Sequence, residues 1–461
     1  MTQLVEALRQ SSVSPVELMH AVLARADATH SALNALCARR DPEALLAEAR
    51  AAEERIARGN GRSLEGIPFA VKDLEDAAGL PTTFGSRLFQ DAVPAERDSL
   101  QVARLRAAGA ILFGKTNAPE FGFTAITKNL VFGTTRSPWD RERSPGGSSG
   151  GSAALLAGEV MPLVTASDGG GSIRIPASFT GAFGVKPSYG RIPRGPSEFW
   201  DSLDTAVYGP ITKTVADAAL LLDVLSGPHA LDAKSLPPAG VSYRESLRIK
   251  AQGLRIGLSL DLGYAPVQSD IAACIEDAAR VFTTLGHRLE AVSGGPPEMG
   301  VEWGLLGAYQ LGAEFGPRLA GREADVTRAL LRGVEMARGL TRDWWGETAR
   351  KRARVVEWCA ALFDRCDVLL TPTVPFDPPP AGGPFPSEID GRALPASSAG
   401  SFTIPFNLSW HPAATVRAGS SRAGLPVGMQ IVVPRHREDL LLQLAHAFER
   451  ERPWQHWPKA V

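Results

Sequence analysis

Short apolar runs alternate with helical patterns along this chain, and this alternation constrains the fold more than any other feature. The runs that fit buried strands lie at 67–71, 110–113, 160–164, 254–258, 368–370 and 427–432. Helical patterns lie between them, at 98–108, 214–226 and 298–365. Strand and helix patterns that alternate in this way are typical of α/β layering.

The first 60 residues predict two helices. Ser14–Glu17 is a capping box with proline at the first helical position, and Asp41–Glu43 repeats that pattern. No later segment has the composition of a flexible interdomain linker. We therefore expect one large unit rather than several domains.

Composition places the chain among globular proteins. Hydrophobic residues make up 44% of it and charged residues 21%, which excludes a disordered chain. The 49 basic and 50 acidic residues give a net charge of −1, so neither a nucleic-acid partner nor a membrane partner is expected.

The cysteines are few and scattered, and none forms a C-x-x-C pair, which argues against a disulfide framework and against a metal site. They are Cys37, Cys274, Cys359 and Cys366. The N-terminus lacks a signal-peptide pattern, and no stretch reaches about 18 uninterrupted apolar residues. We expect a cytoplasmic protein with reduced thiols and no membrane span.

Two glycine-serine clusters lie in the middle of the chain, at Ser144–Ser152 and Ser167–Pro176. Glycine lets the backbone approach a ligand closely, and successive N–H groups can converge on a phosphate or on a developing oxyanion. A phosphate loop ends in Gly-Lys-Ser or Gly-Lys-Thr, which neither cluster contains. The pattern therefore favours an oxyanion.

One part of the first cluster, Gly146–Gly150, matches G-x-S-x-G, the nucleophile elbow of α/β-hydrolases. That elbow needs a strand before the serine, and residues 138–145 contain two prolines and several charges that a central strand does not tolerate. It would also need a histidine, for which His411 is the candidate. Otherwise His411 is a structural residue in a turn.

Three segments together resemble the amidase signature family: Gly66–Asp73, Pro145–Ser152 and Asp168–Arg174. Further matches lie at 114–121, 137–140, 184–188, 209–217 and 425–431, so the resemblance covers essentially the whole chain. It implies a single α/β/α layered domain over residues 1–461, with a central mixed β-sheet covered by helices. Its expected parts are N-terminal helices at 1–60, a triad region at 66–190, a pocket and helical region at 191–366, and C-terminal strands and a helix at 367–461.

The resemblance implies a Ser–cis-Ser–Lys triad. Ser172 corresponds to the nucleophile, Ser148 to the bridging serine after a cis peptide at Gly147–Ser148, and Lys72 to the base. A free lysine has a pKa of about 10.4, and burial lowers it by disfavouring the ammonium. The apolar run before Lys72 offers such an environment.

In this mechanism neutral Lys72 takes a proton from Ser148 while Ser148 takes one from Ser172, which attacks a carbonyl carbon. The oxyanion is expected at the backbone N–H groups of an oxyanion loop formed by Gly169, Gly170, Gly171 and Ser172. An acyl-enzyme follows. No metal or cofactor is expected.

Side chains around the triad are also implied. Ser149 and Arg174 resemble family residues that brace it, and Asp168 either orients the oxyanion loop or simply pairs with Arg174. The expected substrate pocket draws on two aromatic loops, 121–127 and 197–201, and on a C-terminal tryptophan. Its candidate residues are Phe123, Thr127, Phe199, Trp200 and Trp410. The region 303–345 is expected to form a lid or a dimer contact.

Three departures from the family pattern bear on the substrate. Gly169 stands where threonine is common, Thr180 where cysteine is common, and Trp410 where a small residue is usual. The first departure, with its flanking residues, resembles hydrolases of 6-aminohexanoate cyclic dimers and related urethanases.

We expect an amidohydrolase for small-molecule amides, with carbamates (urethanes) and aryl amides or esters as further substrates, acting as a monomer or homodimer. The alternative is the glutaminase subunit of a tRNA-dependent amidotransferase, although such subunits usually have glutamine where this chain has Ile175. A Ser–His α/β-hydrolase and a catalytically dead scaffold are two further hypotheses. The scaffold is disfavoured because no triad residue is missing.

Overall fold

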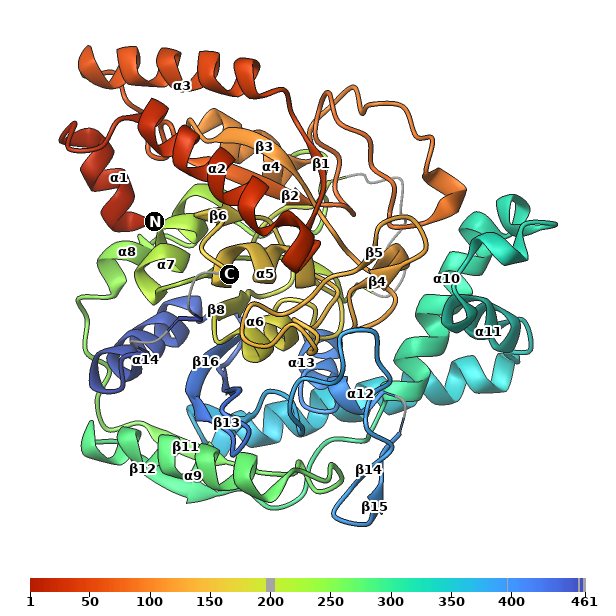
Figure 1. Cartoon of the computed structure of the whole chain (residues 1–461). Coiled ribbons are helices and arrows are strands. Elements are labelled where there is room, and N and C mark those ends of the chain that lie inside the picture. The colour runs from red at the N-terminus through yellow and green to blue at the C-terminus, as the bar shows by residue number, and fades with distance from the viewer. Residues whose placement is uncertain (196–203, 396, 455–456, 459–461) are drawn as a thin grey trace.

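Two mixed β-sheets organise the chain, which we describe from a computed structural model of residues 1–461 (Figure 1). The structure describes all residues except 196–203, 396, 455–456 and 459–461. The larger sheet has the strand order β10 (Ile211–Thr212), β8 (Phe183–Lys186), β16 (Ala413–Ser420), β17 (Pro426–Val432), β13 (Val368–Pro372), β11 (Arg255–Leu258) and β12 (Arg288–Ala291). In it β11 is parallel to β12 and β13, and the other neighbours are antiparallel.

The smaller sheet has the order β1 (Leu36–Arg39), β3 (Ile111–Thr116), β2 (Pro68–Lys72) and β6 (Leu163–Val164). Here β2 is parallel to β3 and β6, and β1 is antiparallel to β3. Three short strand pairs complete the β-structure: β7 (Ser167–Asp168) with β9 (Val207–Tyr208), β4 (Lys128–Asn129) with β5 (Gly133–Thr134), and β14 (Glu388–Ile389) with β15 (Arg392–Ala393).

Helices cover both sheets and lie between them. They are α1 (Thr2–Arg9), α2 (Pro15–Leu33), α3 (Pro42–Ala57), α4 (Leu100–Ala107), α5 (Gly150–Ala157), α6 (Arg174–Thr180), α7 (Val215–Leu225), α8 (Tyr243–Ser246), α9 (Ser269–Thr284), α10 (Gly300–Leu319), α11 (Arg328–Ala337), α12 (Arg342–Arg365), α13 (Ile404–Leu408) and α14 (Glu438–Glu451). The predicted α/β layering with a mixed sheet is confirmed, and the structure adds the second sheet.

The capping signals near the N-terminus act as predicted. The Ser14 hydroxyl accepts from the backbone N–H of Glu17, whose carboxylate accepts from the Ser14 N–H, and α2 begins at Pro15. Asp41 caps α3 by accepting from the N–H of Ala44. The sequence analysis missed α1 and β1, which are short.

The two glycine-serine clusters lead into α5 and α6, in the middle of the molecule (Figure 1). Helix α5 contacts β2 and β6 of the smaller sheet, α6 contacts β8, β16 and β17 of the larger sheet, and the two helices contact each other. Both helices are buried along their whole length. The two sheets adjoin at their edge strands, where β6 contacts β10 and α5 contacts both. The segments before α5 and α6, which carry the candidate triad serines, therefore lie close to this junction.

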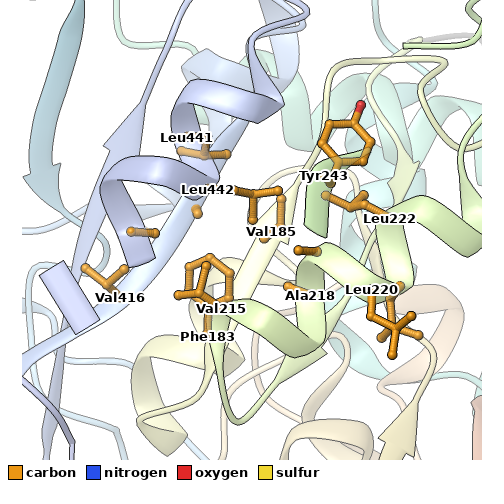
Figure 2. Close-up of a cluster of buried hydrophobic side chains, with 14 of the residues drawn as sticks. Phe183, Val185, Val215, Ala218, Leu220, Leu222, Tyr243, Val416, Leu441 and Leu442 are labelled. Carbon is orange, nitrogen blue, oxygen red and sulfur yellow. The ribbon is translucent and has the colours of Figure 1, made fainter. Parts of the chain in front are cut away.

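A large apolar cluster fixes the larger sheet to its helices. Figure 2 shows Phe183 of β8, Val215 of α7, Val416 of β16 and Leu441 of α14 in one group, all of them buried. Burying a side chain of this size stabilises a fold by about 1.5–3 kcal/mol. This cluster holds β8 and β16 rigidly beneath α6. Within the described part of the chain, no helix has the length and apolar character needed to cross a bilayer.

Candidate active site

Lys72 is the last residue of β2, a strand that is buried at every position. Its side chain is 0% exposed, and its Nζ lies 2.7 Å from the Ser148 Oγ. The backbone N–H of Lys72 donates to the Thr165 hydroxyl at 2.9 Å, and that hydroxyl donates to the buried Glu75 carboxylate at 2.9 Å. Strand pairing and this contact together fix the point from which the amine reaches into the site.

Ser167 supplies two further contacts to the Lys72 amine. The Nζ lies 3.0 Å from the Ser167 hydroxyl and 3.4 Å from the Ser167 carbonyl oxygen. A neutral amine has two N–H bonds and one lone pair. With both N–H bonds directed at Ser167, the lone pair is left for the hydroxyl proton of Ser148, which is the arrangement that a general base requires.

Burial of the Lys72 amine favours this neutral form. Burial lowers the pKa of the Lys72 amine from 10.5 to about 7, although the nearby carboxylates of Glu75 and Asp168 act to raise it. A lysine with this pKa is about half uncharged at neutral pH. The direction of this shift is the one that the sequence analysis expected from burial of Lys72.

Ser148 follows a cis peptide bond, as the resemblance implied for Gly147–Ser148. Gly147 is closely surrounded, because a Cβ there would lie 2.9 Å from the Ala125 carbonyl carbon. The Thr127 hydroxyl donates to the Gly146 carbonyl at 2.8 Å. The Ser148 loop is thus held by backbone and side-chain contacts from the segment 124–127.

Ser172 lies half-buried at the end of the second cluster. The backbone N–H of Ser149 donates to the Ser172 carbonyl at 3.3 Å, so the two serine loops are joined directly. Among the described residues, no hydrogen bond joins the hydroxyls of Ser148 and Ser172. Such contacts are often long in an unliganded site and shorten when substrate binds.

Ser149 connects the loops a second time. Its hydroxyl donates to the Ser167 carbonyl at 3.3 Å and accepts from the Ser167 N–H at 3.4 Å. Because Ser167 also holds the Lys72 amine, Ser149 acts on the site through its neighbour. The bracing role that the resemblance implied for Ser149 stays a prediction.

Asp168 and Arg174 form a fully buried ion pair at 2.9 Å. Burial alone would raise the pKa of Asp168, but the Arg174 guanidinium and the Asn407 amide lower it well below its ordinary value. The carboxylate also accepts from the N–H groups of Gly171 at 2.7 Å and Ile173 at 3.1 Å. Asp168 therefore both pairs with Arg174 and orients the glycine loop.

That contact changes the expected set of oxyanion donors. The Gly171 N–H donates to Asp168, so it is not available to an oxyanion, contrary to the sequence-based prediction. The N–H groups of Gly169, Gly170 and Ser172 have no acceptor within the described part of the chain. These three groups are the donors that the loop can offer.

The predicted pocket residues take different places. Thr127 is fully buried behind the Ser148 loop, so it supports the site rather than lining a pocket. Phe123 packs near Gly333 of α11. Trp410 donates through its indole N–H to the Asp204 carbonyl at 2.6 Å and stacks on Tyr189 at 5.1 Å between ring centroids.

Two further pocket predictions, Phe199 and Trp200, lie outside the described residues.

His411 has the contacts of a structural residue. Its Nδ1 lies 2.9 Å from the Ser409 hydroxyl, and its ring stacks on Phe363. Burial lowers the pKa of His411 to about 3. No strand precedes Ser148 in residues 137–147, so the α/β-hydrolase interpretation finds no support. No group of His, Cys, Asp or Glu suited to a metal is present among the described residues.

Four phenylalanines, Phe84, Phe89, Phe121 and Phe315, form an aromatic cluster that the sequence analysis did not predict. Phe121 stacks on Phe315 of α10 at 5.0 Å and on Phe84 at 6.1 Å, and Phe89 packs edge-on against Phe121. The next residue, Gly122, is close enough to Ser148 that a Cβ on it would lie 3.2 Å from the Ser148 Oγ. Of these four residues, the sequence analysis had placed only Phe121 near the pocket, as part of the aromatic loop at 121–127.

Comparison with known proteins places this chain in a family. The family model described as Amidase matches residues 17–442. An acylamidase from Rhodococcus erythropolis is 34% identical over 98% of this chain and 95% of its own length. A glutamyl-tRNA(Gln) amidotransferase subunit from Geotalea daltonii is 33% identical over 98% of this chain and 97% of its own length.

Solved structures agree. A bacterial aryl acylamidase of the amidase signature family superposes with a TM-score of 0.90 at 32% identity, covering 99% of this chain and 96% of that one. A 6-aminohexanoate cyclic dimer hydrolase complexed with substrate gives 0.88 at 30% identity, covering 100% and 98%. The protein is therefore a hydrolase that acts on C–N bonds of linear amides. It belongs to the Amidase family, as the sequence motifs suggested.

Proposed function

We propose that this protein hydrolyses small-molecule amides through a covalent acyl-enzyme, with Ser172 as nucleophile, Ser148 as proton bridge and Lys72 as base. The observation that carries the proposal is the 2.7 Å contact between the buried Lys72 amine and the Ser148 hydroxyl. It supplies a base without histidine. We further propose that it works as a monomer or homodimer without nucleic-acid or membrane partners.

The proposed steps balance as follows. The Ser172 proton moves to the Ser148 oxygen while the Ser148 proton moves to Lys72, and the Ser172 oxygen bonds to the carbonyl carbon. The carbonyl oxygen becomes an oxyanion that accepts hydrogen bonds from the oxyanion loop. The Lys72 ammonium then returns a proton through Ser148 to the leaving nitrogen, and the C–N bond breaks. Water releases the acyl group by the same relay.

We propose aryl amides as preferred substrates, with carbamates and aryl esters as further ones. The cluster of Phe84, Phe89, Phe121 and Phe315 supports this, because its member Phe121 directly precedes Gly122, where a Cβ would lie 3.2 Å from the Ser148 Oγ. Aromatic rings bind one another in stacked and edge-on arrangements. The resemblance to an aryl acylamidase supports the same substrate class.

A screen of purified protein tests the proposal against aryl amides, aliphatic amides, carbamates and glutamine. Wild type should cleave aryl amides, and Lys72→Ala should lose turnover. His411→Ala, a matched change outside the triad, should keep most of it. A fluorophosphonate should label Ser172, and a label on Ser148 alone would reverse the two serine roles. Activity retained in both Lys72→Ala and Ser172→Ala would reject the triad.

The glutaminase function is the second candidate, because the amidotransferase protein of Geotalea daltonii matches nearly the whole chain. Against it stands Ile175, which is buried in an apolar cluster with Phe179 and Val374 and offers no amide at the position where such subunits usually have one. Glutamine turnover above that of aryl amides, or co-purification with two partner chains, would favour it.

A further inference from the structure

Four peptide groups carry the N–H groups of the oxyanion loop, and their carbonyl oxygens belong to Asp168, Gly169, Gly170 and Gly171. We call the carbonyls of Asp168 and Gly171 the outer two and those of Gly169 and Gly170 the inner two. The Asp168 carbonyl accepts from the Asn407 side-chain amide at 3.0 Å. The Gly171 carbonyl accepts from the Ile175 backbone N–H at 2.7 Å. Both ends of the loop are thereby fixed within the folded core.

The two inner carbonyl groups are held by side chains from distant elements. The Trp303 indole N–H, from the first turn of α10, donates to the Gly169 carbonyl at 2.9 Å. The Thr403 hydroxyl, just before α13, donates to the Gly170 carbonyl at 2.6 Å. The indole ring also lies against Gly170, where a Cβ would be 2.5 Å from Trp303 Cζ2.

Fixing a carbonyl fixes the N–H of the next residue. In a trans peptide the C=O and N–H bonds point in opposite directions from one rigid plane. The only cis bonds among the described residues are Gly147–Ser148 and Gly383–Pro384, so the loop peptides are trans. The Trp303 contact to the Gly169 carbonyl therefore sets the direction of the Gly170 N–H, one of the three uncommitted donors.

The loop needs such external contacts because Gly169, Gly170 and Gly171 have no side chains to limit their backbone angles. Trp303 is itself well held, packing in an apolar cluster with Met299, Val355, Ile404 and Leu408. One residue before it, Glu302 pairs with Lys351 of α12 at 2.5 Å. The contacts between α10 and α12 therefore fix the position of the indole, and the indole in turn fixes the Gly169 carbonyl.

We propose that Trp303 is a positioning residue for the oxyanion site, acting through the Gly169 carbonyl. Thr403 holds the next peptide, whose Gly171 N–H donates to Asp168, so it anchors the loop without directing one of the three uncommitted donors. The inference rests on the proposed function, since it assumes that the oxyanion forms at this loop. It gives the start of α10 a role other than the lid or dimer contact expected for the region 303–345.

The test uses the full-length protein and an aryl amide. Trp303→Phe keeps a ring against Gly170 but removes the indole N–H. Losing a direct oxyanion donor costs about 10²–10³ in kcat, so losing its positioning contact should lower kcat about 10- to 100-fold with KM nearly unchanged. Trp345→Phe, on the same helical region and in contact only with Tyr309 and Trp344 among described aromatic rings, should keep wild-type kinetics.

A second readout needs no amide substrate. The rate at which a fluorophosphonate labels Ser172 should fall in parallel with kcat in Trp303→Phe. Should Trp303→Phe melt below wild type, both rates are measured per fluorophosphonate-titrated site, at a temperature at which both proteins stay folded.

The outcomes separate the two hypotheses. A wild-type protein that neither cleaves amides nor labels at Ser172 refutes the proposed function. A wild-type protein that does both, while Trp303→Phe keeps its kcat and labelling rate, refutes the inference alone. A raised KM with unchanged kcat in Trp303→Phe also overturns the inference, because the indole would then contact the substrate rather than position the loop.

Discussion

The pH dependence of turnover follows from the environment of Lys72. The base form is the uncharged amine, and burial lowers the Lys72 pKa to about 7. Activity should therefore be low in acid and rise as the pH passes through about 7. From pH 6 to pH 8 the uncharged fraction rises from about one tenth to about nine tenths, so kcat/KM should rise about ten-fold. A lysine with its ordinary pKa would place this rise near about pH 10.

The assay is kcat/KM for a chromogenic aryl amide between about pH 5.5 and about pH 10, since kcat/KM reports on the free enzyme. A control is needed because burial also lowers the pKa of Lys186 to about 7. Lys186 donates to the Pro187 carbonyl and contacts no triad residue. Lys186→Met should keep the inflection. A rise centred above about pH 9, or loss of the inflection in Lys186→Met, would refute the reasoning.

Three other changes probe the site. Ser167→Ala removes the hydroxyl that contacts the Lys72 amine, and steady-state kinetics should show kcat lowered about ten-fold with KM unchanged. A wild-type kcat would contradict a role for Ser167 in holding the amine. Asp168→Asn leaves the Arg174 charge buried and uncompensated, and should reduce the free energy of unfolding in denaturant by about 3–5 kcal/mol; a change below about 1 kcal/mol would count against it. Phe121→Ala should raise KM for aryl amides about ten-fold and for aliphatic amides much less, and equal effects on both would argue against an aromatic pocket.

The sequence predicted those parts of the site that local patterns encode. Lys72 ends an apolar run, and such a run is buried whichever sheet contains it. The cis peptide before Ser148 came from the family resemblance rather than from physical reasoning. The role of the Gly171 N–H was missed, although an aspartate three residues earlier is a known local acceptor for backbone N–H groups.

The rest of the site depends on contacts between distant segments. Phe84 and Phe315 both pack on Phe121, yet more than two hundred residues separate them, and nothing in either segment indicates that they meet. For Trp303 the sequence predicted a helix and a lid or dimer contact, and nothing near it indicated a contact with the glycine loop. The division of the β-structure into two sheets was equally hidden, because pairing partners such as β8 and β16 lie far apart in the chain.

The buried Arg174 links the second glycine-serine cluster to segments late in the chain. Its guanidinium donates to Gln430 at 2.7 Å and to the Thr403 carbonyl at 3.0 Å, and both partners lie in the last sixty residues. During synthesis on a ribosome, Lys72, Ser148 and Ser172 emerge long before these partners do. A nascent chain would therefore carry all three proposed triad residues before the partners of Arg174 exist, so we expect catalysis to begin only after residues 403–430 have been synthesised and folded.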